Sequence, residues 1–331
     1  MIVQRDKAAF IFPGQGSYGV GMGRDLHDAS AAAREVWNSV DSSLAGQFSE
    51  IVFRGSEDDL RPTEVQQPAI VATSVGALAA FNEVIGVNGS AVGSGYPIDV
   101  VAFAGHSVGI ISALIAAGCT PVGEAIPLVR DRGLYMADAA QAKPGRMAAV
   151  LGLELAEVEN MVARIRNEIP GSYLSIANIN APGQVIVAGD LLAIDQIVGE
   201  GKAAGARRVV TLNVSGAFHT IAMLPARSAM NDRLVAVGID PPVAPVISNI
   251  DASKLTNALS IRAELADHIV APVQWLDGVR TIEGLGVRHI VEFGHGSVLN
   301  GMLRRTLSTV ELHNVTDWES ACDVANRLTN G

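Results

Sequence analysis

A single stretch sets the class of fold, Val100-Val101-Ala102-Phe103-Ala104-Gly105-His106-Ser107-Val108-Gly109-Ile110-Ile111-Ser112-Ala113-Leu114. Its first five residues are an unbroken apolar run, which is typical of a strand buried on both faces of a parallel sheet. The chain then turns sharply and continues as an apolar, alanine-rich helix that stops near Gly118. Strand, Gly-x-Ser-x-Gly and helix together indicate a nucleophile elbow, in which a tight turn presents the serine at the carboxyl edge of the sheet.

Ser107 is therefore the candidate nucleophile. The motif is short, and the alternative is a glycine-flanked turn with an incidental serine. The strand before it and the helix after it favour the nucleophile. The free N–H groups and the positive dipole end at the start of that helix would face a developing oxyanion.

The composition limits the classes of function. With 331 residues the chain is one large domain or a domain with an insert, and its net charge of −10 argues against a nucleic-acid partner. Cys119 and Cys322 are the only cysteines, which excludes a disulfide framework and predicts a cytoplasmic protein. Residues 1–7 carry charges and lead into a strand, so we expect no signal peptide. The apolar runs are too short and too interrupted to span a membrane.

A glycine-rich loop follows a short apolar strand over residues 8–12. It reads Pro13-Gly14-Gln15-Gly16-Ser17. A dinucleotide-binding loop would need a later acidic contact to the ribose, which is not evident, and Pro13 stands where the first glycine is expected. The alternative is a loop whose backbone approaches an active site, where Gln15 would lend its N–H to an oxyanion.

Two predicted helices flank the elbow. Residues 63–68 are predicted to be a cap-like turn before a helix over residues 69–84. Residues 121–140 are predicted to be a helix that carries Arg130 and Arg132. An arginine on a helix is usually a solvated surface group, and the residues alone favour that interpretation here.

Residues 147–206 change in character. Strands are predicted over 147–151, 173–179, 184–188 and 208–214, with helices over 154–169 and 191–204. This β-α-β-β-α-β order is that of a ferredoxin-like fold. We predict an α/β protein with a hydrolase-like core and a parallel sheet over residues 1–144 and 215–331. The ferredoxin-like subdomain, residues 145–214, is inserted into it.

His219 is the candidate base among seven histidines. It lies in Ser215-Gly216-Ala217-Phe218-His219-Thr220, just past a predicted strand end, where loops of α/β folds build sites. A base must reach the serine hydroxyl by a hydrogen bond, so we pair His219 with Ser107. A structural histidine is the alternative.

Several separated segments resemble malonyl-CoA:acyl-carrier-protein transacylase and the similar acyltransferase domains of polyketide synthases. Four carry the resemblance: residues 12–17, residues 105–109, Arg132-Gly133 with Met136, and residues 216–219. Residues 178–184, 272–275 and 292–294 extend it over nearly the whole chain.

The resemblance implies the roles of the catalytic residues. Ser107 would be the nucleophile and His219 its base. The backbone carbonyl of Gln274 would orient His219 in place of a carboxylate. The N–H groups of Gln15 and Val108 would form the oxyanion hole.

The resemblance also implies the substrate contacts. Arg132 would bind the free carboxylate of a malonyl group, with Gln67, Asn178 and Asn180 as neighbours of the site. Two residues depart from the family. Ile110 stands where the family has glutamate, which puts a polar contact from that position in doubt. His295 stands in Gly294-His295-Gly296, where the family has proline.

The reaction implied is ping-pong acyl transfer from malonyl-CoA to holo-acyl carrier protein in fatty-acid biosynthesis, by a monomer that needs no metal or cofactor. Three alternatives stay open: a polyketide or mycolic-acid-like loading enzyme, an acyl hydrolase with the same serine and histidine, and a non-catalytic nucleotide-binding protein. Carrier proteins of this pathway are acidic, so a local basic patch is expected to dock them; the alternative is a set of scattered, solvated arginines. Its candidates are Lys202, Arg207, Arg208, Arg304 and Arg305.

Overall fold

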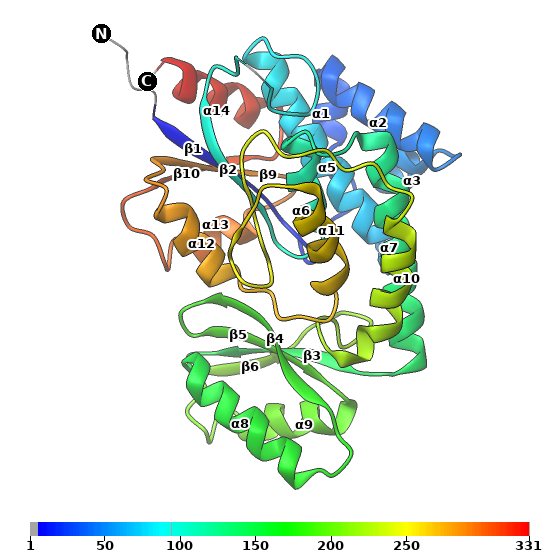
Figure 1. Cartoon of the computed structure of the whole chain (residues 1–331), viewed down its shortest axis with the longest axis vertical. Helices are drawn as coiled ribbons and strands as arrows, with labels where there is room; N and C mark the ends of the chain where they lie inside the picture. The colour runs from blue at the N-terminus through cyan, green and yellow to red at the C-terminus, as the bar shows by residue number, and fades with distance from the viewer. Residues whose placement is uncertain (1–5, 94, 331) are drawn as a thin grey trace.

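Two β-sheets organise the chain, which a computed structural model describes for residues 6–93 and 95–330. Residues 1–5 of the charged N-terminal stretch, and residue 94 within the Gly-, Ser- and Asn-rich segment before β2, lie outside the described residues. Figure 1 shows the larger sheet with most of the helices in an upper body, and the smaller sheet with its own helices in a lower body.

The larger sheet has the strand order β10-β9-β1-β2-β7-β8. Its strands are β1 (Lys7–Phe12), β2 (Asp99–Gly105), β7 (Val246–Ile247), β8 (Lys254–Leu255), β9 (His289–Phe293) and β10 (Glu311–Val315). All neighbouring pairs are parallel except β7 with β8. The predicted parallel sheet is confirmed.

Helices cover both faces of this sheet. They are α1 (Arg24–Ala29), α2 (Ala31–Ser43), α3 (Phe48–Arg54), α4 (Glu57–Leu60), α5 (Thr63–Val84), α6 (Gly109–Ala116), α7 (Val122–Ala142), α10 (Leu224–Leu234), α11 (Ala258–Asp267), α12 (Trp275–Glu283), α13 (Val298–Leu303) and α14 (Trp318–Asn330), with a 3₁₀ turn η1 (Ile221–Met223). Alternate residues of β1 divide between two cores. Phe10 and Phe12 pack in the one that holds α5 and α6, whereas Ile11 packs in the one that holds α12 and α13.

Helix α5 begins six residues earlier than predicted, at Thr63, and contains Pro68. The predicted turn over residues 63–68 is therefore wrong. Its first turns pack closely on α7, where a Cβ atom at Gly133 would lie 2.7 Å from the Cα atom of Glu64. This packing outweighs the single backbone hydrogen bond that a proline removes. As a result, Gln67 lies on a helix that faces α7.

The smaller sheet has the order β4-β5-β3-β6, and all its pairs are antiparallel. Its strands are β3 (Arg146–Leu151), β4 (Leu174–Ala181), β5 (Gln184–Gly189) and β6 (Arg208–Thr211), with helices α8 (Leu155–Glu168) and α9 (Leu191–Glu200). A separate apolar cluster that includes Val150, Ile165 and Ile194 forms its core. The last helix and strand end earlier than predicted, at Glu200 and Thr211.

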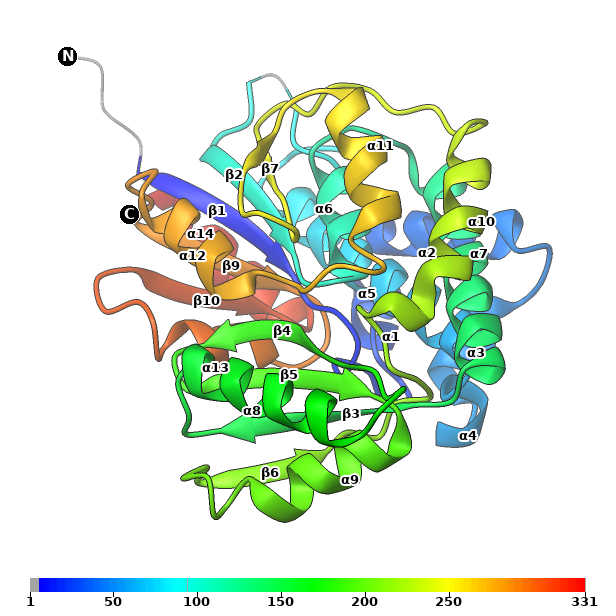
Figure 2. The same cartoon turned by 60° about the horizontal axis from the view of Figure 1, so that its bottom comes forward.

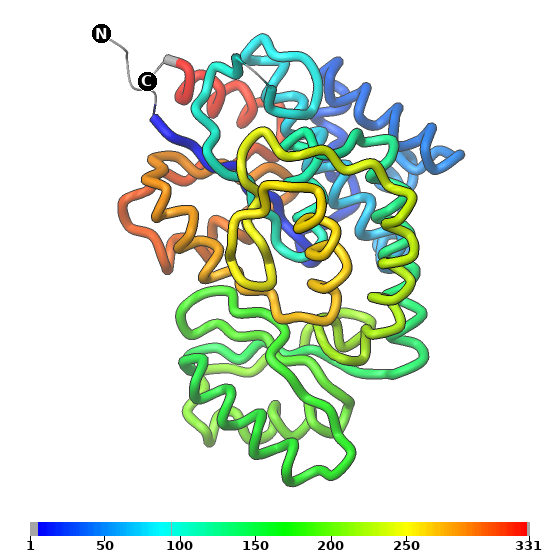
Figure 3. Tube along the Cα trace, in the orientation of Figure 1, coloured from blue at the N-terminus to red at the C-terminus, as the bar shows by residue number. Residues whose placement is uncertain are grey.

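The chain enters the lower body after α7 and returns to the upper body at α10, as the tube in Figure 3 shows. Strand β4 faces the upper body (Figure 2) and is joined to it by backbone hydrogen bonds. The Ile179 N–H donates to the Val273 carbonyl at 2.9 Å, and the Val273 N–H donates to the Ala177 carbonyl at 2.8 Å. The boundaries at residues 144/145 and 214/215 stay predictions. Within the described ranges, no helix is long and apolar enough to cross a bilayer.

Candidate active site

The elbow between β2 and α6 holds Ser107 in a left-handed backbone conformation, with φ of 51°. Its two glycines are required sterically. A Cβ atom at Gly105 would lie 2.0 Å from the Gly109 carbonyl carbon, and one at Gly109 would lie 2.3 Å from the Phe12 carbonyl oxygen. Few residues other than glycine adopt positive φ without strain, so the surroundings must hold the serine in place.

Asn249, which follows β7, is the side chain that holds this elbow. Its Oδ1 accepts the Ser107 N–H at 2.9 Å, and its Nδ2 donates to the Gly105 carbonyl at 3.0 Å. The buried carboxylate of Glu264 accepts the Asn249 N–H and the Ser248 hydroxyl, each at 2.7 Å. Burial raises the pKa of Glu264 to about 7. Asn249 and Glu264 were not predicted from the sequence, although the polar pair Ser248-Asn249 directly after an apolar strand was a signal for Asn249.

His219 lies within hydrogen-bond distance of the nucleophile, with Nε2 2.9 Å from the Ser107 Oγ. Both side chains are buried. Burial, and then the charge of Arg132, lower the pKa of His219 to about 3, so the ring is neutral at neutral pH. Its Nδ1 lies 2.8 Å from the carbonyl oxygen of His268. A carbonyl can only accept, so the proton is on Nδ1 and Nε2 is free to accept the serine proton.

The prediction that the Gln274 carbonyl orients His219 is wrong. Gln274 precedes α12, and its carbonyl accepts the Gly278 N–H at 2.9 Å, as the first carbonyl of a helix does. Its own N–H donates to the Asn249 carbonyl at 2.7 Å. The orienting carbonyl belongs to His268, at the end of α11, a residue that was not predicted as part of the site.

Arg132 is fully buried, so the surface interpretation of this arginine is wrong. Its Nη1 donates to Gln67 Oε1 at 2.5 Å, and its Nη2 lies 3.0 Å from His268 Nε2 and 3.3 Å from Ser107 Oγ. Its Nε has no partner among the described residues. Desolvation lowers the pKa of Arg132 to about 9, so the group is cationic at neutral pH. Burying a cation that has only neutral partners costs desolvation free energy, and an anion bound beside Arg132 would offset this cost.

The glycine-rich loop lies against the elbow. A Cβ atom at Gly14 would lie 2.3 Å from the His106 carbonyl oxygen, which is why the loop can approach so closely. Val108 directly precedes α6. Within the described chain, neither the Gln15 N–H nor the Val108 N–H has a protein acceptor. Both donors are therefore available to a ligand.

The two asparagines of β4 differ in their contacts. Asn180 Oδ1 lies 2.9 Å from His106 Nε2, directly beside the nucleophile. Asn178 is buried and forms a backbone bridge with Val273.

The two departures from the family pattern are both packing residues. Ile110 is fully buried in the core around α6, and half-buried His295 packs with its Nε2 close to Gly19.

Three of the five candidates for the basic patch, Arg207, Arg208 and Arg305, lie at one end of the smaller sheet. Arg305 Nη1 donates to Gln184 Oε1 at 3.0 Å, and Gln184 pairs across the sheet with Leu151, which pairs in turn with Arg208. The Arg207 N–H donates to the Leu151 carbonyl at 2.8 Å. None of the five candidates forms an ion pair with another described residue.

Two other features lie apart from Ser107. His289, Glu311 and His313 could hold a metal ion, with His289 Nδ1 3.1 Å from His313 Nε2. His289 begins β9, so it lies at the amino edge of the parallel strands, opposite the elbow.

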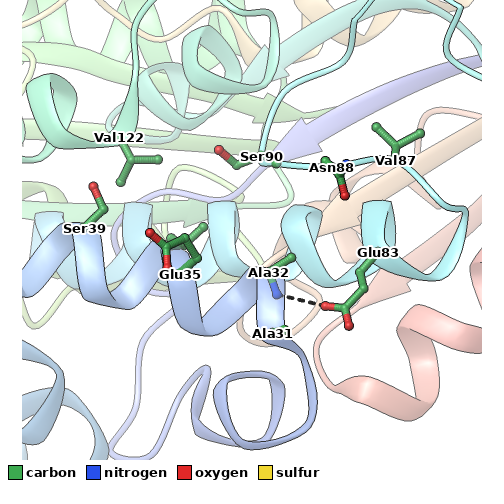
Figure 4. A pocket seen from close by; sticks show the side chains of 11 residues that line it. Ala31, Ala32, Glu35, Ser39, Glu83, Val87, Asn88, Ser90 and Val122 are labelled. Atoms are coloured by element: carbon green, nitrogen blue, oxygen red, sulfur yellow. Dashed lines mark hydrogen bonds between the residues drawn. The ribbon is translucent and has the colours of Figure 1, made fainter.

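A groove of about 580 Å³ lies between α2, the end of α5 and residues 87–90 (Figure 4). Its Glu83 is already engaged, because the carboxylate accepts the Ala32 N–H at 2.9 Å at the start of α2.

A buried serine at a strand–helix elbow, with a neutral histidine against its hydroxyl, defines the class of serine-dependent acyl-transfer enzymes. Residues 9–326 match the family described as the acyl transferase domain. The chain belongs to this family. It is 33% identical over 314 residues to the malonyl CoA-acyl carrier protein transacylase of Bacillus subtilis, covering 95% of each chain. The resemblance inferred from the motifs is thus confirmed.

Solved structures agree with this family. The malonyl CoA-acyl carrier protein transacylase of Coxiella burnetii has a TM-score of 0.90 at 30% identity over 98% of each chain. The acyl-carrier-protein-S-malonyltransferase of Bartonella henselae has a TM-score of 0.90 at 33% identity, over 98% of this chain and 100% of its own. A malonyl-transacylase solved in complex with a type II PKS acyl-carrier protein has a TM-score of 0.89 at 31% identity, over 98% and 100%.

Proposed function

We propose that this chain transfers a malonyl group from malonyl-CoA to the phosphopantetheine thiol of holo-acyl carrier protein, through a malonyl ester of Ser107. One observation carries the proposal. Arg132 is a buried cation, it lies 3.3 Å from the serine hydroxyl, and no carboxylate of the described chain pairs with it. A malonyl ester of that serine ends in a carboxylate, which supplies the missing counter-ion. The names of the relatives support the same reaction.

The loading step uses the Ser–His pair. His219 Nε2 takes the Ser107 proton as the hydroxyl oxygen attacks the thioester carbonyl of malonyl-CoA. The N–H groups of Gln15 and Val108 stabilise the oxyanion of the tetrahedral intermediate. When the intermediate collapses, the carbon–sulfur bond breaks, and the CoA thiolate takes the proton from His219.

The transfer step reverses these roles. His219 takes the proton of the carrier-protein thiol as the sulfur attacks the malonyl ester. The ester bond breaks, Ser107 regains its proton, and malonyl-carrier protein leaves. Arg132 holds the carboxylate through both steps, and Gln67 holds Arg132. Asn180 fixes His106 beside the nucleophile, and we propose that Asn178 is a further neighbour of the site.

The pathway proposed is fatty-acid biosynthesis in the cytoplasm, in keeping with two free cysteines. A loading role in type II polyketide synthesis is the second candidate, because one similar structure contains a carrier protein of that system.

Intact-protein mass spectrometry tests the proposal. Incubation with malonyl-CoA should add one malonyl group to the wild-type chain and none to Ser107→Ala. Transfer to holo-acyl carrier protein should be lost in the same variant. A malonyl adduct that persists in Ser107→Ala would show that another residue carries the acyl group. An adduct that hydrolyses without transfer would favour the acyl hydrolase.

A further inference from the structure

The side chain of His268 joins the two functional parts of the site. It is fully buried at the end of α11. Its Nδ1 lies 2.7 Å from the Glu264 carbonyl oxygen, and its Nε2 lies 3.0 Å from Arg132 Nη2. Because the carbonyl can only accept, the ring proton is on Nδ1 and the lone pair on Nε2 accepts from Arg132. The backbone carbonyl of the same residue orients His219.

We propose that the imidazole of His268 is a positioning residue for acyl-group selection, which holds the guanidinium of Arg132 beside Ser107. The inference rests on the proposed function and assigns to one residue two separable tasks. Its backbone serves the base, and its side chain serves the arginine that receives the acyl carboxylate. A side-chain substitution therefore tests the second task and leaves the carbonyl in place.

The contacts of Arg132 show why this ring matters most after the serine is acylated. Within the described ranges, the guanidinium of Arg132 has three partners, Gln67, His268 and the Ser107 hydroxyl. The serine oxygen becomes part of an ester in the acyl-enzyme and is then a weaker acceptor. Gln67 and His268 are left to hold the guanidinium, one on each terminal nitrogen.

The chemistry of the acceptor matters as well. A neutral imidazole accepts a hydrogen bond from Arg132 and does not neutralise its charge. Burial and the neighbouring charge of Arg132 keep the pKa of His268 well below its ordinary value. A carboxylate at this position would pair with Arg132 within the protein and compete with the carboxylate of the substrate.

The test compares malonyl-CoA with acetyl-CoA loading in three variants. His268→Gln keeps an acceptor and should retain the malonyl preference of the parent. His268→Leu removes the acceptor and should lower kcat/KM for malonyl-CoA by about tenfold, the effect of one charge-assisted hydrogen bond. His268→Glu should lower malonyl loading at least as much. Acetyl loading should change little in all three. His289→Leu, a buried histidine at the opposite sheet edge, is the matched control.

Equal losses for both acyl groups in His268→Leu would reduce the ring to a structural role and overturn the proposal. If His268→Leu does not fold, the comparison of His268→Gln with His268→Glu tests the proposal. An equal malonyl-to-acetyl preference in these two variants would also overturn the proposal. Failure of the proposed function looks different. In that case the wild-type chain and Arg132→Ala would show the same malonyl-to-acetyl ratio, whatever residue stands at position 268.

Discussion

Replacing Arg132 with alanine should convert a malonyl-selective enzyme into one that loads small acyl groups with little discrimination. A charge-assisted hydrogen bond contributes about 1.5–3 kcal/mol. Because about 1.4 kcal/mol is a factor of ten in rate, kcat/KM for malonyl-CoA should fall by about tenfold to a hundredfold or more. Acetyl-CoA makes no contact that depends on the guanidinium charge, so its loading should hold steady or improve.

The structure also predicts a small effect of Arg132→Ala on stability. The change leaves Gln67 Oε1 and His268 Nε2 without their donor. Each buried acceptor without a partner costs about 1–3 kcal/mol. The change also removes a fully buried cation, whose desolvation opposes folding. These two effects on the free energy of unfolding have opposite signs and partly cancel. The midpoint of thermal unfolding should therefore shift little, whereas kcat/KM for malonyl-CoA falls strongly.

The assay is rapid-quench loading with each acyl-CoA, read as intact mass, on parent, Arg132→Ala and Arg130→Ala. Arg130 is exposed two residues away on the same helix and is the matched control. It should match the parent with both substrates. Equal losses of malonyl and acetyl loading in Arg132→Ala would mean that Arg132 is structural, and the malonyl proposal would lose its main physical support.

Three further predictions concern the base, the elbow and the carrier protein. The folded pKa of His219, about 3, lies below its ordinary 6.5. Loading should therefore show no protonation step of His219 near pH 6.5, and the stability from this group should be full above pH 6.5 and decline as the pH falls toward 3. The pKa of Glu264, about 7, lies in the same range, so a loading inflection at pH 6–7 contradicts this prediction only if it persists in Glu264→Gln. His219→Ala should lose about 10²–10⁴ in rate. Asn249→Ala should lower the free energy of unfolding by about 2–6 kcal/mol, because the Ser107 N–H and the Gly105 carbonyl lose their partner, and an unchanged urea midpoint would refute that anchor. Arg305→Glu should raise the Michaelis constant for holo-acyl carrier protein by up to about fivefold and leave malonyl-CoA loading unchanged, since an exposed charge pair contributes about 0.2–1 kcal/mol. Identical carrier kinetics would exclude this residue from docking.

Local features of the chain were predicted well because they depend on residues close in sequence. The apolar run before Ser107 is typical of a buried strand. Gly105 is required by a backbone contact with Gly109, four residues along the chain, whereas Gly109 is required by the distant Phe12 carbonyl. The strands and helices of the smaller sheet follow from periodicity in the same way. The start of α5 was mispredicted because its stability comes from contact with Gly133 on α7, which lies far along the chain.

The amino-acid sequence by itself determined the elbow, the parallel sheet and the identity of Ser107. It also identified His219 as the base through its motif. Only the tertiary structure decided which carbonyl orients that base, since this depends on where the end of α11 lies against residue 219. For Arg132 the family resemblance implied a substrate contact, and the tertiary structure showed that its side chain is a buried cation beside the nucleophile. The orienting carbonyl and the burial of Arg132 both depend on contacts between segments far apart in the chain, which the local pattern of residues does not determine.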